Sequence, residues 1–336
     1  MKTLKTLQVA VWLLVFSLTL GACNALAALG RGDIGGAIAE GIKTGAEVTA
    51  ALSKGEIIDE YSPEQEYYMG RGVTSAVVSK FPSANMDEAN TREQVAYLNQ
   101  MAGYIYNCSL SVDRAKLGGH VERSDEDIAR KQRFNLFKGM HVGIMQTDEV
   151  MAFAMPGGFL WISRGMIKLC KTEDELAAVI AHEIGHIVMN HGMDLYRDAH
   201  NKQVEDSRLF GALEAGAGDS ELGKAAVNFG KLCGSFFEGL LENGYPKAQE
   251  MEADNFGTRA LAASGYDPKA LLVVLREVET REKSNPTEEK YLKNHPKVED
   301  RVKAVDKVIK DAKLKTPSPD SGKAARDKRY KEVWGR

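Results

Sequence analysis

Apolar residues recur at helical spacing along most of the chain between residues 62 and 311. Ser62-Pro63-Glu64-Gln65 is typical of a helix start, because the serine hydroxyl can cap the first turn and proline is tolerated there. This helix is expected to end near Lys80, ahead of Phe81-Pro82. Later periodic stretches predict helices over residues 89–107, 173–192, 200–215, 220–241, 246–264, 268–283 and 298–311.

A different pattern fills residues 134–163, where short apolar runs alternate with turn-forming residues. Thr147-Asp148 and Pro156-Gly157-Gly158 mark two of the turns. Because no other part of the chain is strongly strand-like, we predict one small antiparallel sheet beside the helix of residues 173–192, in a mainly helical α+β fold. Its strands are expected over residues 134–137, 142–146, 150–155 and 159–163.

Length and composition are those of an ordinary globular protein. The 336 residues can bury a sizeable core, and the fractions of 43% hydrophobic and 27% charged residues exclude fibrous and disordered classes. A formal net charge of -3 gives no field that would favour nucleic acid as a partner. Residues 313–336 differ, since they contain eight Lys/Arg against three Asp/Glu. We expect a solvated basic tail there, with contact to anionic lipid as the alternative.

The N-terminus has the composition of an export signal. Two lysines precede an apolar run over residues 7–20, which is shorter than the roughly 20 residues of a membrane span. The run ends in Leu20-Gly21-Ala22-Cys23, which resembles the lipobox of bacterial lipoproteins, where the cysteine sulfur is acylated. This resemblance implies a lipid anchor on Cys23, and Asn24 after it implies the periplasmic face of the outer membrane. Signal cleavage near Ala25-Leu26-Ala27, which would give a soluble periplasmic protein, is the alternative.

These features divide the chain into four parts. Residues 1–22 are expected to form the signal peptide. Residues 23–58 form a lipidated tether rich in glycine and alanine, with a membrane-lying element as the alternative. Residues 59–312 form the folded domain, and residues 313–336 form the basic tail.

The cysteines suggest no thiolate metal site. Beyond Cys23, the chain contains Cys108, Cys170 and Cys233, and the sequence leaves open whether two of them form a disulfide. No Cys-x-x-Cys pair occurs, so a zinc site built from thiolates is not expected.

His182-Glu183-Ile184-Gly185-His186 lies inside a long apolar helical stretch and carries the candidate chemistry. Residues four apart on a helix differ by about 40° in direction, so both imidazoles leave the same face one turn apart. Two nitrogens so placed suit one zinc ion, and Glu183 beside them can act as general base on a zinc-bound water. Gly185 leaves room for close packing under the ligands. The competing interpretation is a core helix with two hydrogen-bonded histidines.

A catalytic zinc site needs a third protein ligand and an open fourth position. Met189 and Gly192 stand where an extended zincin motif would place its glycine and histidine, so that subclass is excluded. His191 is expected to point away from the ligand face and to interact with the C-terminal end of the helix.

The sequence offers a glutamate from a second helix instead. Glu250 and Asp254 are one turn apart on one helix face, so Glu250 can bind zinc while Asp254 accepts the free N–H of a ligand histidine. Glu252 is expected on a solvated face. The competing interpretation is that these acids all solvate a helix.

Together these motifs resemble the HtpX, BepA and LoiP group of bacterial zinc metallopeptidases, which is related to the CAAX prenyl proteases and the mitochondrial Oma proteases. Two further segments match that group: Ala152-Phe153-Ala154-Met155-Pro156-Gly157-Gly158, and His295-Pro296 followed by Arg301. The match covers about residues 60–311. The chain shows neither several membrane spans nor helical repeats, which favours the small LoiP-like lipoprotein branch.

The resemblance implies a gluzincin-like HExxH zincin with one zinc ion per chain. It implies that residues 152–158 contain an edge strand on which an extended substrate lies. His295 would enter the site from a loop and stabilise the oxyanion, with a capping or surface role as the alternative. Arg301 would orient the loop that carries His295, or pair with a carboxylate near the metal. Met151 stands where the group has asparagine. That departure brings local hydrogen bonding into question but leaves the zinc motif intact.

We therefore expect a zinc endopeptidase that cleaves unfolded or damaged proteins of the cell envelope. The alternative from another functional class is a zinc-binding lipoprotein that holds client proteins, as a chaperone does, without cleaving them. A third hypothesis is a latent protease in which His295 fills the open zinc position.

Overall fold

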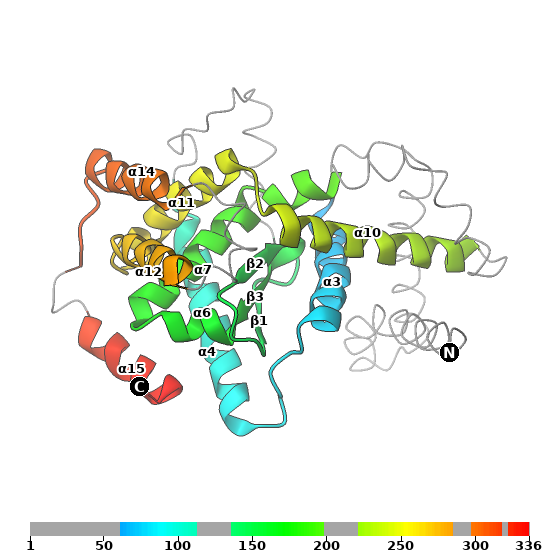
Figure 1. Ribbon diagram of the computed structural model, residues 1–336, viewed down its shortest axis with the longest axis horizontal. Helices are drawn as coiled ribbons and strands as arrows, with labels where there is room; N and C mark the ends of the chain where they lie inside the picture. The colour runs from blue at the N-terminus through cyan, green and yellow to red at the C-terminus, as the bar shows by residue number, and fades with distance from the viewer. Residues whose placement is uncertain (1–60, 113–135, 198–220, 285–296, 318–321, 336) are drawn as a thin grey trace.

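The structure is a computed structural model that describes residues 61–112, 136–197, 221–284, 297–317 and 322–335 (Figure 1). Within these residues the chain is mainly helical with one small sheet, as the sequence predicts. The helices are α3 Pro63–Lys80, α4 Ala89–Ser109, α6 Arg164–Leu169, α7 Glu173–Val188, α10 Glu221–Asn243, α11 Lys247–Ala263, α12 Ala270–Ser284, α14 Val298–Asp311 and α15 Lys323–Trp334. The strands are β1 His141–Met145, β2 Ala152–Met155 and β3 Phe159–Ser163, with the 3-10 turn η2 Pro156–Gly158 between β2 and β3.

The start of α3 follows the predicted chemistry. The Ser62 side chain accepts a hydrogen bond from the Gln65 N–H at 3.2 Å, and the Gln65 side chain accepts one from the Ser62 N–H at 2.8 Å. This reciprocal box satisfies two backbone donors at the helix start. Helices α4, α10, α11, α12 and α14 also coincide with predicted helices to within a residue or two. The helix predicted over residues 200–215 lies outside the described residues.

The sheet is mixed, whereas the sequence predicted an antiparallel one. β2 and β3 form the expected antiparallel hairpin across η2, with Phe153 opposite Trp161. β1 pairs in parallel with the other side of β3, so the strand order is β1-β3-β2. Turn residues identify a hairpin between neighbouring strands, but they do not indicate a strand that reaches the far edge through a longer connection. Residues 136–137 of the first predicted strand are irregular.

The two faces of the sheet belong to two hydrophobic cores. Leu160 and Ile162 of β3 pack in the core that contains α4, α7, α11 and α12. Phe159 and Trp161 of the same strand pack with α3 and α10. This alternation is the period-two pattern of a strand that is buried on both faces. In Figure 1, α7 lies between the sheet and the pair α11 and α12.

Helix α7 is the central helix of the larger core, and nearly all of its residues are buried. Thr172 caps its start by accepting a hydrogen bond from the Glu175 N–H at 3.2 Å. The helix ends at Val188, short of the predicted Gly192, because Asn190 adopts a left-handed conformation with φ of 59°. The chain turns at this point and is helical again over residues 191–197.

The C-terminal segment is a packed helix, so the expectation of a solvated tail was wrong for α15. This helix packs against α4 and α7 and buries two of its apolar side chains. Arg326 binds Asp174, and Arg329 binds Glu173, both in the first turn of α7. Two basic side chains of this segment therefore hold the start of the central helix.

None of the helices within the described ranges is long and apolar enough to cross a membrane. No disulfide joins Cys108, Cys170 and Cys233 in this part of the chain. Cys170 and Cys233 are buried in different hydrophobic cores. The signal peptide, the tether and the lipidation site at Cys23 fall on residues 1–60, which lie outside the described residues.

Candidate metal centre

The two histidines of the HExxH pattern lie together on one face of α7. Their Nε2 atoms are 3.1 Å apart. His182 is 8% exposed and His186 is 1% exposed. The spacing of four residues produces this arrangement, because each imidazole leaves the helix in nearly the same direction one turn apart.

Glu250 of α11 brings a carboxylate to the same point. Its Oε2 atom lies 3.5 Å from His182 Nε2, and its Oε1 atom lies 3.4 Å from His186 Nε2. The three ligand atoms lie within 4.8 Å of one another. Atoms bound at about 2.0–2.1 Å to one tetrahedral ion are about 3.3–3.4 Å apart. The three side chains therefore fit a zinc ion in both atom type and spacing.

Asp254 and Arg301 form a layer behind His182. Asp254 Oδ1 lies 2.9 Å from His182 Nδ1, the contact that the helix spacing predicts. Two nitrogens of Arg301, from α14, donate to the two oxygens of Asp254 at 2.8 and 2.7 Å. Burial alone would raise the pKa of Asp254, but the charge and hydrogen bonds of Arg301 hold this pKa below its ordinary value. Asp254 thus stays ionised and accepts the Nδ1 proton of His182, which leaves Nε2 facing Glu250.

His191 and Glu252 also belong to the centre, and the expectations for both residues were wrong. His191 Nδ1 lies 2.9 Å from His186 Nδ1, and His191 Nε2 lies 3.2 Å from Glu252 Oε2. His191 is 0% exposed and Glu252 is 3% exposed, so neither side chain faces solvent. The turn at Asn190 explains the difference, because His191 does not continue the spiral of α7 and its ring returns to His186.

Glu183 follows His182 on α7 and is 7% exposed. Burial would lower the pKa of Arg301, but the charges of Asp254, Glu250 and Glu183 raise it. The carboxylate of Glu183 therefore acts electrostatically at the centre without belonging to the group of three ligand atoms.

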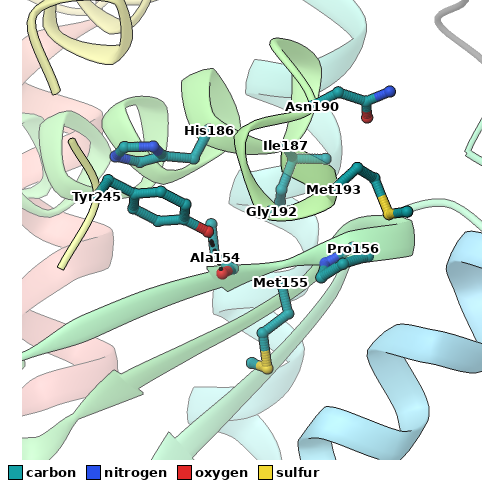
Figure 2. A pocket seen from close by; sticks show the side chains of 9 residues that line it. All are labelled: Ala154, Met155, Pro156, His186, Ile187, Asn190, Gly192, Met193 and Tyr245. Atoms are coloured by element: carbon teal, nitrogen blue, oxygen red, sulfur yellow. Dashed lines mark hydrogen bonds between the residues drawn. The ribbon is translucent and has the colours of Figure 1, made fainter. Parts of the chain in front are cut away.

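Tyr245 forms one wall of the centre, although no sequence motif indicates it. Its ring stacks on His186 with a centroid distance of 3.9 Å and an angle of 16°, and its hydroxyl donates to the Ala154 carbonyl at 2.9 Å (Figure 2). A small cavity of about 10 Å³ adjoins this contact. Tyr245 directly precedes Pro246, the N-cap of α11. An aromatic residue before a helix cap is a signal for local packing, but it does not indicate a metal centre.

Close packing of α7 on α11 brings the three ligands together. A Cβ atom added at Gly185 would lie 2.9 Å from Ala253 Cα, and one added at Gly257 would lie 3.0 Å from His182 N. These glycines allow the two helix backbones to approach closely. The sequence predicts this role for Gly185, whereas the role of Gly257 follows only from the structure.

β2 is an edge strand, since it pairs with β3 alone among the described residues. The Ser163 N–H donates to Met151 O at 3.0 Å, which makes this residue pair hydrogen-bonded. Hydrogen-bonded and non-hydrogen-bonded pairs alternate in an antiparallel ladder, so Ala152 and Ala154 turn their backbone N–H and C=O groups away from β3. These outward groups are the ones that an added strand would bind.

Most of the expected substrate segment is buried, including Ala154, which is 1% exposed. Phe153 and Met155 pack in the core with α3 and α10, and so does Met151, which is 4% exposed. The turn after β2 depends on glycine, because Gly157 has φ of 70° and a Cβ atom there would lie 2.4 Å from Tyr67 Cα. The hairpin is therefore fixed against α3, and the outer edge of β2 is its side without a paired strand among the described residues.

Two expected functional residues are not placed. His295 and its neighbour Pro296 lie in residues 285–296, outside the described residues, and Cys23 lies in residues 1–60. Arg301 of the same motif is described, and it pairs with carboxylates of the centre. Its third nitrogen lies 3.2 Å from Glu250 Oε2.

Comparisons with known proteins point to one family. The chain is 30% identical over 168 residues to the Beta-barrel assembly-enhancing protease of Escherichia coli, covering 48% of this chain and 33% of that protein. It is 28% identical over 131 residues to Metalloprotease LoiP of Escherichia coli, covering 38% of this chain and 47% of that protein. It is 25% identical over 183 residues to the Mitochondrial metalloendopeptidase OMA1 of Schizosaccharomyces pombe, covering 54% and 48%. The chain thus spans between a third and a half of the length of these curated relatives. The model of Peptidase family M48 matches residues 115–309, more than half of the chain, and the chain therefore belongs to peptidase family M48.

Proposed function

We propose that this chain is a zinc-dependent endopeptidase in which His182, His186 and Glu250 hold one zinc ion and Glu183 is the general base. The observation that carries the proposal is the convergence of two imidazole nitrogens and a carboxylate at 3.1, 3.4 and 3.5 Å, in a buried site built from two helices. Family membership and the names of the relatives support a metallopeptidase.

The chemistry follows from the side chains around this point. A zinc ion held by His182, His186 and Glu250 would supply a Lewis acid for a water molecule and for the carbonyl of the scissile bond. Glu183 accepts a proton from the attacking water as its oxygen bonds to the carbonyl carbon. The same carboxyl then delivers the proton to the amide nitrogen, which leaves as the C–N bond breaks. Asp254 and Arg301 keep His182 oriented throughout.

The substrate class follows from the edge strand. Only an extended polypeptide can pair with the outward backbone groups of Ala152 and Ala154, because folded segments have already satisfied their own N–H and C=O groups. The proposed substrates are therefore unfolded or damaged proteins. Export of the chain would make these proteins components of the cell envelope.

His295 is the proposed donor to the oxyanion of the tetrahedral intermediate. Removing one such donor lowers kcat by a factor on the order of 10². We expect this loss in His295→Ala at unchanged zinc content. Unchanged peptide turnover in the variant would reject the role.

The decisive experiment combines metal analysis with proteolysis. Wild-type protein is expected to bind one zinc ion per chain and to digest casein. Glu183→Gln is expected to keep the zinc and lose the digestion, whereas Glu250→Ala is expected to lose both. Client binding that is equal in wild type and Glu183→Gln, with no cleavage in either, would show the chaperone-like alternative. Casein digestion by metal-loaded Glu183→Gln at the wild-type rate would reject Glu183 as the base.

The proposed location is the periplasmic face of the outer membrane. Residues 1–22 would be removed as a signal peptide, and a lipid on Cys23 would anchor the domain of residues 59–312 through the tether of residues 23–58. Labelled palmitate should enter wild type and not Cys23→Ala. Labelling that persists in the variant would reject the anchor and leave the soluble periplasmic alternative.

A further inference from the structure

Tyr245 connects the candidate metal centre to the edge strand. Tyr245 is 4% exposed, and its ring stacks on the imidazole of His186 with a centroid distance of 3.9 Å. Its hydroxyl donates to the carbonyl oxygen of Ala154 at 2.9 Å. Figure 2 shows the side chain spanning the space between the helix that carries His186 and the strand that carries Ala154.

The acceptor of this hydrogen bond is one of the groups that a substrate needs. Ala154 belongs to a non-hydrogen-bonded pair with Leu160, so its carbonyl points away from β3 toward the open edge. A strand added to that edge would place a backbone N–H about 2.9 Å from the same oxygen. The Tyr245 hydroxyl already donates to this oxygen at 2.9 Å, so the N–H of an added strand has to compete with it for the same acceptor.

The hydroxyl satisfies a carbonyl that the fold buries, since Ala154 is 1% exposed. Its exchange for another donor keeps the Ala154 carbonyl satisfied. Gly244, which precedes Tyr245 with φ of 61°, forms the short connection between α10 and α11 from which the side chain projects.

We propose that Tyr245 occupies the substrate's backbone position on β2, and that an extended polypeptide must displace its hydroxyl from the Ala154 carbonyl before it can be cut. The inference rests on the proposed function of β2 as the substrate strand. Tyr245 thus competes with weakly binding chains for the edge, while its ring stacks on His186. A substrate that forms several backbone hydrogen bonds along β2 displaces the hydroxyl, whereas a single contact does not.

The test separates the hydroxyl from the ring. Tyr245→Phe keeps the aromatic stack on His186 and removes only the donor. Binding of a labelled, unstructured casein peptide is measured on the zinc-loaded Glu183→Gln protein, with and without Tyr245→Phe. The peptide Kd is expected to fall by about three- to tenfold, the value of one hydrogen bond that no longer has to be displaced. In the active protein, KM should fall by the same factor at unchanged kcat and unchanged zinc content.

A matched variant controls for the loss of any tyrosine hydroxyl. Tyr104 is 52% exposed on α4, and its hydroxyl donates to Ser264 O at 3.1 Å, away from the edge strand. Tyr104→Phe should change neither the peptide Kd nor KM. An unchanged Kd in Tyr245→Phe would overturn the inference, since it would show that the Ala154 carbonyl accepts both donors. A fall in kcat at unchanged KM would also overturn it and would place the hydroxyl in the chemistry.

The binding measurement does not depend on catalysis. If wild type digests nothing but Tyr245→Phe tightens peptide binding, the proposed peptidase activity fails and the role of Tyr245 stands. If wild type digests casein and the peptide Kd does not respond, the activity stands and the role of Tyr245 fails. Absence of peptide binding in all of these variants rejects the inference as well.

Discussion

The two candidate histidine ligands are oriented in different ways. His182 donates its Nδ1 proton directly to Asp254, which Arg301 holds from behind. His186 reaches a carboxylate only through a second imidazole, since its Nδ1 contacts His191 and the far nitrogen of His191 contacts Glu252. If His186 donates from Nδ1, His191 must accept at Nδ1 and carry its own proton on Nε2, toward Glu252. Both routes leave Nε2 of the ligand histidine available for a metal.

This arrangement predicts that His191 controls metal affinity. His191→Gln removes the ring that orients His186, and loss of such a partner typically weakens metal binding by about 10- to 100-fold. We expect that increase in the zinc Kd, measured by competition with a chromophoric chelator. His141→Gln, on β1, changes the same residue type away from the centre and should leave the Kd unchanged. Equal zinc affinity in wild type and His191→Gln would contradict the role.

Glu66 predicts a dependence of stability on pH. Burial raises the pKa of this carboxyl to about 7, although the Asn190 amide lowers it in part. Because the folded state holds the proton more tightly than the unfolded state, the stabilising contribution is complete below pH of about 4.5 and is lost as the pH rises through about 7. The Tm of Glu66→Gln, relative to wild type, should therefore be higher at pH 8.5 than at pH 5.5, by differential scanning fluorimetry at equal ionic strength.

The control for Glu66 comes from the same helix turn. Glu64 is the other acid in the first turn of α3, so Glu64→Gln measures the loss of a carboxylate near the helix N-terminus. A Tm difference between Glu66→Gln and wild type that is the same at both pH values would show that Glu66 does not titrate in this range.

Spacing within one helix is enough to predict the two residue pairs at the middle of the centre, but not that His191 contacts them. His182 with His186, and Glu250 with Asp254, are each one helical turn apart, and the structure brings all four together. His191 was expected to point away because a continuous helix would rotate it by about 140° from His186. The left-handed turn at Asn190 is a local event that this periodicity does not show.

At the scale of elements, the crossing of α7 and α11 determines where the ligands meet. Gly185 faces Ala253, and Gly257 faces the backbone of His182, so the crossing has almost no side-chain volume between the helices. Each helix supplies ligands close to this point. A change in helix separation would therefore move Glu250 relative to both histidines.

Gly185→Ala tests this crossing. Its methyl group would lie 2.9 Å from Ala253 Cα, so one helix must move, at a cost of about 1–3 kcal/mol for overpacking. We expect a lower Tm and weaker zinc binding in the same variant. Gly103→Ala is the matched control, because nothing lies within 4 Å of a Cβ atom at Gly103 on α4. There the same substitution should raise stability by up to about 1 kcal/mol through helix propensity. A Gly185→Ala protein with wild-type Tm and zinc affinity would contradict the packing argument.

Elements were predicted correctly where the residues that form a helix cap or a turn are close together in the sequence. The capping box at Ser62 and the glycine turn after β2 indicated α3 and the β2–β3 hairpin. The parallel pairing of β1 depends on residues far from its own turns. The burial of α15 rests mainly on Tyr330 and Val333, two apolar positions in a highly charged stretch, which is too weak a periodic pattern to predict packing.

At the scale of the whole molecule, α7 joins the parts of the fold. It packs against α4, α11, α12 and β2, and its first turn is held by α15. The buried carboxylate of Glu173 accepts hydrogen bonds from Tyr97, Tyr266 and Arg329, which come from three different parts of the chain. Helix α7, which carries His182 and His186, is thus held at its N-terminus by polar contacts and along its length by the hydrophobic core. Its C-terminal half, where both histidines lie, packs against α11.

Zinc bound at this end should therefore stabilise the entire fold. A ligand that binds only the folded state at 1,000 times its Kd adds about 4 kcal/mol, which corresponds to a Tm increase on the order of 10 °C for a domain of this size. We expect this increase when zinc is added to chelator-treated wild type, in a single unfolding transition, because α7 cannot detach without opening the larger core. Glu250→Gln should lose most of the increase, whereas Glu242→Gln, at an exposed position of α10, should keep it. An equal increase in Glu250→Gln and wild type would mean that zinc binds elsewhere on the chain.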